Sequence, residues 1–312
     1  MGRYVLVRIC SSVMVFFAIT LFVFVCFFAM PRQTFGRRAV PEQYRIHGSL
    51  AGAYSHYVWR FVRHGDLGYS YQNRERVAVR LWRAAPVTLS LVAGGLVVWV
   101  LISVPLGLLA ALRPRSFLDR VSTVVVLIGL SAQPLWLGLV FSWFFGHYLN
   151  VLPASGYCSM GNLSTGCDGV GRWAAHLVMP WFTFAVVNAA LFTAMIRALV
   201  LEELHADYVT TAVAKGVAPR RILRRHVLRN VSIPLVTMAA LTAGTALTIV
   251  VFVESAFDLP GVGGLLRQSI LRRDVPMTAG SILFLALIVM LLNLLVDMLY
   301  AVIDPRIRVR AT

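Results

Sequence analysis

Six long apolar stretches constrain this chain more than any other feature of its sequence. Each is close to the roughly 20 residues that an α-helix needs to cross a bilayer. They lie near Val7–Met30, Pro86–Leu112, Val121–Leu149, Ala175–Leu199, Ser232–Ser255 and Met277–Ile303. Because lipid offers no partners for backbone polar groups and strand-like alternation is absent from the sequence, these stretches must span as helices. The sequence therefore predicts an all-α membrane protein with six transmembrane helices.

The composition agrees with this class and decides how the first stretch is interpreted. Hydrophobic residues make up 59% of the chain and charged residues 13%, which excludes an ordinary soluble domain. Arg3 and Arg8 precede the first stretch, as in a secretory signal peptide. However, the run Ile9–Phe28 is longer than the apolar region of about 7–15 residues that signal peptides carry, so we expect a retained helix.

The net charge of +16 comes mainly from arginines that lie between the apolar stretches. This placement favours contact with anionic lipid head groups over nucleic-acid binding. Four short basic segments fall on one side of a six-span chain, which predicts that both termini are cytoplasmic. These segments are the tail with Arg3 and Arg8, Arg113–Arg120, Arg197–Arg229 and the tail from Arg306 to Arg310. The long first external loop is also rich in arginine, but charge counts carry little weight in long loops.

The same pattern divides the chain into three parts. Residues 1–30 form an N-terminal tail and the first transmembrane helix, and residues 31–85 form an external loop region. Residues 86–312 form a core of five transmembrane helices that carries a cytoplasmic coupling loop at 201–231.

The polar segment Asp207–Pro234 has the features of a helix–turn–helix. Acidic Glu202, Glu203 and Asp207 suit the positive end of a helix dipole. Gly216 suits a left-handed helix end, and Pro219 suits the first turn of a second helix. Two interpretations are open: a basic loop that only fixes membrane topology, or a rigid knob that inserts into a groove on a partner.

Particular residues of this segment resemble the "EAA" loop by which the permease subunits of ABC importers bind their ATPases. They are Ala212, Ala214, Lys215, Gly216, Asn230 and Pro234. Thr211 occupies the place of the glutamate for which the loop is named. Further segments resemble the permeases of dipeptide/oligopeptide/nickel ABC importers, specifically the dipeptide permease B type. They include Gly65–Gly68, Gly129–Ser131, Leu152–Gly156, Arg273–Pro276, Asn293–Asp297 and Asp304–Arg306.

This resemblance implies a type I ABC importer permease fold in the bacterial cytoplasmic membrane and a function in importing short peptides. Relatives that carry nickel or another small solute keep an alternative cargo open. The implied partners are a second homologous permease subunit, cytosolic ATP-binding subunits that hold ATP and Mg²⁺, and an extracytoplasmic substrate-binding protein. The implied ATPase-docking residues are Asp207, Tyr208, Ala212, Ala214, Lys215, Gly216, Arg224, His226, Asn230 and Pro234.

The chain itself lacks a sequence motif for ATP binding. A P-loop requires GxxxxGK[ST], and the only lysine, Lys215, is preceded by Ala214 and followed by Gly216. We therefore expect no catalytic residues, no bound cofactor and no enzyme activity in this chain. A self-contained secondary transporter would show inverted sequence halves or paired interrupted spans, which are not visible. An intramembrane enzyme would need a nucleophile–base pair or metal ligands within the spans, whereas the histidines lie at or beyond span ends.

Several other residues carry predictions of their own. Glu254, Phe257 and Asp297 are candidates for the translocation path or external gate, although Glu254 and Asp297 also suit interhelical hydrogen bonds. Cys158 and Cys167 flank a turn-rich segment and suit either a disulfide or two unpaired thiols. No cysteine or histidine spacing matches a metal site. Pro134 is expected to kink the third span.

Overall fold

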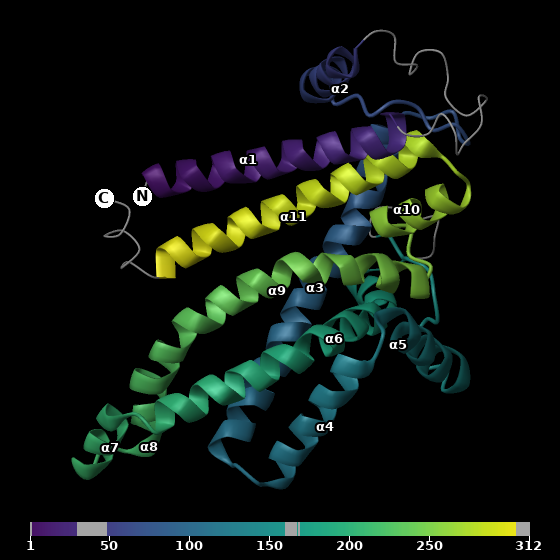
Figure 1. The fold of residues 1–312 in the computed structure, drawn as a ribbon. Helices are drawn as coiled ribbons and strands as arrows, with labels where there is room; N and C mark the ends of the chain where they lie inside the picture. The colour runs from purple at the N-terminus through teal and green to yellow at the C-terminus, as the bar shows by residue number, and fades with distance from the viewer. Residues whose placement is uncertain (1, 30–48, 160–166, 168, 304–312) are drawn as a thin grey trace. The chain divides into compact units, whose positions relative to one another are not determined.

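The computed structural model of the chain is helical (Figure 1). It describes residues 2–29, 49–159, 167 and 169–303, and at some helical positions, Asp297 among them, it describes the backbone alone. Within these ranges the strand-like structure is confined to a single antiparallel bridge between Tyr69 and Arg76. This result confirms that the described part of the chain is all-α, as expected from the need of spanning segments to satisfy their own backbone hydrogen bonds.

The chain folds as two compact units. Unit 1 comprises Met1–Leu89 and Pro260–Leu294, and unit 2 comprises Ser90–Leu259 and Leu295–Thr312. Two long helices contribute to both: α3 (Val77–Leu112) and α11 (Val275–Ile303). This division differs from the one drawn from the apolar stretches, because contacts join segments that lie far apart in sequence.

Unit 1 contains α1 (Gly2–Phe24), which continues as a π-helical turn at Val25–Ala29, then α2 (Leu50–His64) and α10 (Val262–Leu271). The start of α3 supplies Val77 and Leu81 to a buried cluster with Val262 and Met277. A second cluster joins Val23 of α1 to Ala279 and Leu283 of α11. These contacts bring the two ends of the sequence of unit 1 into one core.

A buried carboxylate ties the segment before α3 to the turn before α11. Asp274 accepts hydrogen bonds from the Ser70 hydroxyl, from the Tyr71 amide at 3.2 Å and from the Met277 amide at 3.3 Å. The Asp274 side chain lies in the interior, where a carboxylate is tolerated only when its oxygens are hydrogen-bonded. Asp274 therefore fixes the path of the chain as it enters α3.

Unit 2 contains α4 (Phe117–Ser131), α5 (Pro134–Phe141), a π-helical segment at Ser142–Tyr148, α6 (Val170–Leu204) and α9 (Leu228–Ala256). Its core forms around Trp99 of α3 and Phe192 of α6, whose ring centroids lie 4.9 Å apart. Ala185, Ala189 and Ile196 extend this core along α6. Small residues let the helices approach closely, as membrane helices commonly do.

Four helical stretches in the described part are long and apolar enough to cross a bilayer. They are Leu6–Phe27, Val77–Leu112, Val170–Leu204 and Val275–Leu295. The bent pair formed by α4 and α5 makes a fifth if it counts as one span. The expected stretch Ser232–Ser255 lies within the continuous 29-residue helix α9. The structure thus supports a multi-pass architecture, and the count of six spans stays a prediction.

The third expected span breaks sharply where a kink was expected. Helix α4 ends at Ser131, α5 begins at Pro134, and the two helices are bent by 112°. Proline lacks an amide hydrogen and is favoured in the first turn of a helix, so Pro134 begins α5 readily. The residue before a proline also disfavours the helical conformation, and Gln133 is extended with ψ of 132°.

Candidate functional site

The segment between α6 and α9 forms the helix–turn–helix that its sequence predicts. Helix α7 (Asp207–Ala214) is followed by a turn, and α8 (Pro219–Ile222) then continues through a π-helical turn at Leu223–Val227 into α9. Gly216 has φ of +73°, a left-handed conformation that favours glycine. We call residues 207–230 the coupling hairpin (α7 and α8 in Figure 1).

The base of the coupling hairpin belongs to the hydrophobic core of unit 2. Val209 of α7, Ile222 of α8 and Val227 are buried, and they join the cluster that contains Ile196 and Val200 of α6. Interiors packed in this way deform little and transmit displacement to their neighbours. The hairpin is therefore a rigid extension of α6 and α9.

A polar triangle closes the open end of the coupling hairpin. The Tyr208 hydroxyl donates to the Glu203 carboxylate, and the Asn230 side-chain amide lies 3.4 Å from the same carboxylate oxygen and 3.3 Å from the Tyr208 oxygen. The ring of His226 lies 6.3 Å from that of Tyr208, centroid to centroid. Partial burial and the hydrogen bond to anionic Glu203 raise the pKa of Tyr208 above its ordinary value. The triangle ties the end of α6 to the starts of α7 and α9.

One detail of the sequence interpretation was wrong. Glu202 and Glu203 lie in the last turn of α6, and the acidic residue at the start of α7 is Asp207 alone. The error arose because α6 extends to Leu204, past the apolar run that marked its expected end at Leu199. Glu203 is also a functional candidate that sequence reasoning missed, since its partner Asn230 lies 27 residues away.

The outer surface of the hairpin presents most of the predicted docking residues. Ala212 and Pro234 are half-buried, and Pro234 lies inside α9. The remaining members of the predicted set are exposed: Asp207, Tyr208, Ala214, Lys215, Gly216, Arg224, His226 and Asn230. The arrangement combines an exposed basic tip with a buried base, which is the geometry required of a knob that binds a separate partner.

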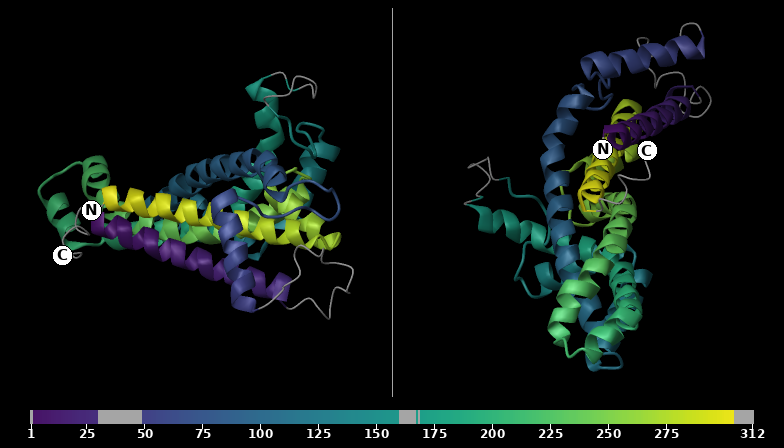
Figure 2. Two further views of the ribbon diagram at one scale, coloured as in Figure 1. Left: turned by 90° about the horizontal axis from the view of Figure 1, so that it is seen from above. Right: turned by 90° about the vertical axis from the view of Figure 1, so that its left-hand side faces the viewer.

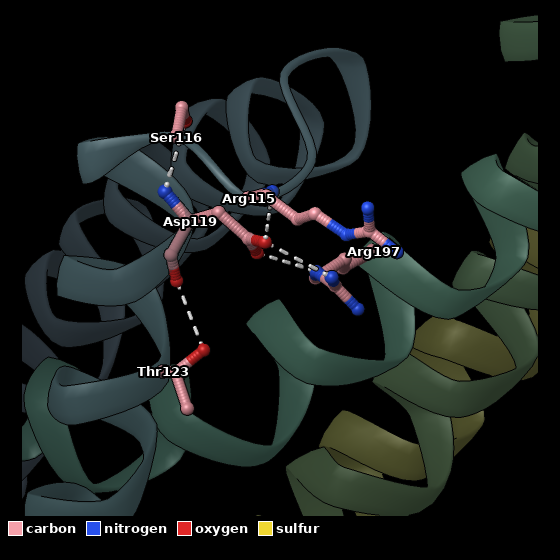
Figure 3. A network of polar contacts seen from close by, with 5 residues as sticks. All are labelled: Arg115, Ser116, Asp119, Thr123 and Arg197. Carbon is pink, nitrogen blue, oxygen red and sulfur yellow. Dashed lines mark hydrogen bonds and ion pairs between the residues drawn. The ribbon is translucent and has the colours of Figure 1, made fainter.

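A second polar network lies between α4 and α6 (Figure 3). Arg197 donates from Nε to one oxygen of Asp119 at 2.7 Å and from a terminal nitrogen to the other at 3.2 Å. The backbone amide of Arg115 also donates to Asp119, at 2.9 Å, and the hydroxyl of Ser116 caps α4. Charge-assisted pairs of this two-point type are strong and directional. The network fixes the turn between α3 and α4 against α6.

Of the predicted pathway residues, Glu254 lies in the last turn of α9 and Phe257 directly follows that helix. Glu254 and Phe257 are both fully buried within unit 2, and Phe257 accepts a hydrogen bond at its carbonyl from the Gly156 amide. Asp297 lies in α11, and its side chain is outside the described part of the structure. Burial of Glu254 and Phe257 is compatible with a closed gate or with helix packing, so their role stays a prediction.

The two cysteines of the loop between α5 and α6 are joined. Cys158 and Cys167 form a disulfide with their Cα atoms 5.6 Å apart, and both are buried. Cys10 and Cys26, both in the N-terminal helical segment, are free. Among the described residues, no group of three or more histidine, cysteine or acidic side chains is placed to hold a metal ion.

Comparison with known proteins decides the family. Residues 103–309 match the family model described as the binding-protein-dependent transport system inner membrane component. This chain belongs to that family. The permease therefore serves as a membrane component of a transport system and is not itself the ATP-hydrolysing enzyme.

Relatives of the permease match over most of its length. It is 33% identical over 272 residues to the dipeptide transport system permease protein DppB of Escherichia coli strain K12, covering 82% of this chain and 80% of that protein. It is 30% identical over 319 residues to the probable peptide ABC transporter permease protein y4tP of Sinorhizobium fredii, covering 99% and 100%.

A solved structure confirms the type of fold. It describes inward-facing conformations of the MetNI methionine ABC transporter, and it matches 72% of this permease and 96% of its own chain with a TM-score of 0.54. The two sequences are 20% identical, so the likeness concerns the fold alone. It agrees with the type I importer permease fold that the sequence resemblance implied.

Proposed function

We propose that this permease is one of two membrane subunits of an ATP-driven importer of short peptides. Its relatives named as dipeptide or peptide permeases support the cargo. In this proposal the chain crosses the bacterial cytoplasmic membrane six times, with both termini in the cytoplasm. A second homologous permease, cytosolic ATP-binding subunits and an extracytoplasmic binding protein complete the transporter.

The observation that carries the proposal is the coupling hairpin, which is exposed at its tip and rigid at its base. Lys215 and Gly216 lie at the exposed turn, while Val209 and Ile222 lie in the core. A loop that only fixed topology would need basic residues but no buried base. The combination therefore favours a knob that binds the cytosolic ATPase subunits.

The placement of basic segments supports the proposed orientation. The turn between α3 and α4, which carries Arg113 and Arg115, lies toward the same end of unit 2 as the coupling hairpin (Figures 1 and 2). Clusters of arginine next to spans favour the cytoplasmic side. Both segments would then face the compartment that holds ATP.

The proposed mechanism follows from the contacts of the hairpin. When the ATPase subunits close on ATP and Mg²⁺, they displace the hairpin, and the shared core carries that displacement into α6 and α9. The polar triangle keeps the hairpin from pivoting against α6. The two permeases then rock, and the cavity between them opens toward the loaded binding protein. Glu254, Phe257 and Asp297 are proposed to line or gate this cavity.

The test is to purify the tagged permease in mild detergent together with its partners and to reconstitute the complex in liposomes with the binding protein. We expect ATP-dependent uptake of labelled dipeptides and tripeptides, and no uptake when the ATPase subunits are omitted. Uptake of nickel ions in place of peptides would overturn the proposal that the cargo is a short peptide. Uptake driven by an ion gradient without ATPase subunits would overturn the importer itself and favour a self-contained secondary transporter.

A further inference from the structure

Helix α2, which lies in the region predicted from the sequence to be an external loop, packs an aromatic face against α1. The ring of Phe61 lies 5.9 Å from that of Phe16, centroid to centroid. The rings of Tyr54 and Tyr57 lie 5.5 and 5.6 Å from that of Phe24. Aromatic contacts at these distances bury large areas and fix relative orientation. The aromatic face of α2 is therefore already occupied by α1.

Hydrogen bonds fix the position of α2 along the length of α1. The hydroxyl of Tyr54 lies 2.9 Å from the hydroxyl of Thr20 and donates to the Phe17 carbonyl at 3.1 Å. Thr20 is buried, so this contact is made inside unit 1. In an apolar setting such a hydrogen bond is costly to break.

Both ends of α2 are also fixed. The Ser49 hydroxyl caps its first turn by accepting from the Gly52 amide at 3.2 Å. At its other end Arg60 binds Asp66, which also accepts from the Gly68 amide at 2.9 Å. Burial alone would raise the pKa of Asp66, but these hydrogen bonds outweigh it and hold the pKa below its ordinary value. Asp66 thus stays anionic and keeps the end of α2 in place.

The contacts place α2 beside one half of the α1 span. The apolar span of α1 runs from Leu6 to Phe27, and its contacts with α2 involve Phe16 to Phe24. At 1.5 Å per residue these positions lie about 15 to 27 Å along the span from Leu6. They correspond to the leaflet farther from the N-terminus. Helix α2 crosses α1 at a steep angle (Figure 2, left), so it lies roughly in the plane of that leaflet.

The opposite face of α2 is exposed and mixes polar side chains, Ser55, His56 and Arg63, with large apolar ones. Trp59 is 51% exposed and Val62 is 65% exposed. The guanidinium of Arg63 lies 5.4 Å from the Trp59 ring. The spanning helix α1 carries an exposed apolar surface of its own, where Met14 and Phe22 are 76% and 69% exposed. Such a surface on a spanning helix faces lipid, and tryptophan beside arginine is typical of the membrane–water interface.

We propose that α2 is an interfacial helix embedded in the leaflet that surrounds the C-terminal half of α1. Trp59 and Val62 contact the acyl chains near the head groups, and Arg63 extends to the lipid phosphates. This arrangement anchors the chain just before α3 and supports the segment Arg60–Gly68 from the lipid side. It requires only the membrane location of the permease, so it stands whether or not the cargo is a peptide.

Spin-label accessibility in the reconstituted full-length permease tests this placement. In a Cys10→Ser, Cys26→Ser background, which keeps the Cys158–Cys167 disulfide, a label is attached at Val62→Cys. We expect apolar oxygen to relax this label several-fold more than a polar nickel chelate does. Labels at Phe22→Cys on α1 and at Arg220→Cys on the coupling hairpin provide the lipid-facing and water-facing references.

Two outcomes would overturn the proposal. Equal or greater relaxation by the nickel chelate, as at Arg220→Cys, would place the exposed face of α2 in water. Protection from both reagents would show that a protein covers it. Repeating the measurement with and without the second permease and the binding protein would then identify that protein. If Val62→Cys does not fold, Trp59→Cys tests the same face, and a label there must show the same preference for oxygen.

Discussion

Arg197 on α6 holds both carboxylate oxygens of Asp119 on α4, at 2.7 and 3.2 Å, although the two residues lie 78 positions apart in the sequence. The Asp119 side chain is 11% exposed and that of Arg197 is 37% exposed. The pair therefore lies at the boundary between the core of unit 2 and its surroundings. It joins the basic turn after α3 to the helix that leads into the coupling hairpin.

Removal of this pair is expected to destabilise unit 2. Arg197→Ala leaves a carboxylate whose side chain is only 11% exposed without its charged partner, which should lower the melting temperature of unit 2. Arg220→Ala, which removes an exposed arginine, serves as a matched control and should change stability by less than about 0.5 kcal/mol. Thermal unfolding of both variants in lipid nanodiscs measures the difference. Equal melting temperatures would mean that the pair contributes nothing.

The Tyr208 hydroxyl is expected to matter for coupling more than for folding. Tyr208→Phe removes the donor to Glu203 and a contact with Asn230, which loosens the hairpin against α6. Losing about 1 kcal/mol at this joint should reduce peptide uptake per ATP hydrolysed about fivefold. Parallel assays of uptake and ATPase activity in proteoliposomes measure the ratio. Thr210→Ala, at an exposed neighbouring position, is the control and should leave the ratio unchanged.

The same tyrosine predicts a dependence on alkaline pH. The folded pKa of Tyr208 is raised, so its contribution to stability is complete below the ordinary value of 10.0 and is lost as pH rises through the raised folded value. Ultraviolet difference titration of the native permease against Tyr208→Phe isolates this phenol. Ionisation of Tyr208 below pH 10 would contradict the polar triangle.

The left-handed turn at Gly216 provides a test of the rigid-knob mechanism. A Cβ at this position meets no atom within 4 Å, so the effect of a substitution comes from backbone strain at φ of +73°. Gly216→Val should cost about 1–2 kcal/mol and distort the hairpin tip, which uncouples transport without preventing membrane insertion. Gly216→Asn, which tolerates this conformation better, should retain most of the uptake. Wild-type uptake by Gly216→Val would count against docking through this turn.

Close packing of α4 against α6 depends on a glycine. A Cβ at Gly129 would lie 2.6 Å from the Ala190 Cβ and 3.0 Å from the Val186 carbonyl oxygen. Gly129→Ala should therefore destabilise unit 2 by about 1–3 kcal/mol. The same change at Gly171, where a Cβ meets nothing within 4 Å, should be neutral or slightly stabilising. Melting temperatures of the two alanine variants measure this effect. Equal values would show that α4 does not approach α6 closely at Gly129.

Thiol counting tests the disulfide of the loop between α5 and α6. Of the four cysteines, Cys10 and Cys26 are free, so alkylation of the denatured, unreduced permease should add two groups, and prior reduction should add two more. Intact mass spectrometry reads both numbers. Four groups without reduction would show that Cys158 and Cys167 are unpaired in the protein as isolated.

The hairpin could be predicted because local sequence signals mark its helix ends. Contacts between residues that are distant in the sequence could not be predicted in this way. Asp207, Gly216 and Pro219 mark helix ends through their own backbone preferences, and each lies where those preferences indicated. Glu203 was missed because its role depends on Asn230, and nothing in the neighbourhood of either residue specifies the other. The pairing of Asp119 with Arg197 is of the same kind, since only the packing of α4 on α6 brings them together.

Hydropathy also misplaced helix ends that extend beyond an apolar run. Helix α3 begins at Val77, nine residues before the expected start at Pro86, because its first turns carry Arg80 and Arg83 on surfaces that need not face lipid. Helix α2 was overlooked because it mixes apolar and polar residues and is shorter than a span. The break at Pro134 was foreseen as a kink, but its magnitude depends on how α5 packs within unit 2.

The buried base of the coupling hairpin has a consequence for engineering. Because Val209, Ile222 and Val227 belong to the core while the tip residues face outward, the proposed docking surface and its scaffold are encoded by different positions of one short segment. The outward set could be transplanted from another permease while the inward set is retained. If the hairpin docks as proposed, such a graft would direct the subunit to the ATPase subunits of another transporter without changing the core that holds the hairpin.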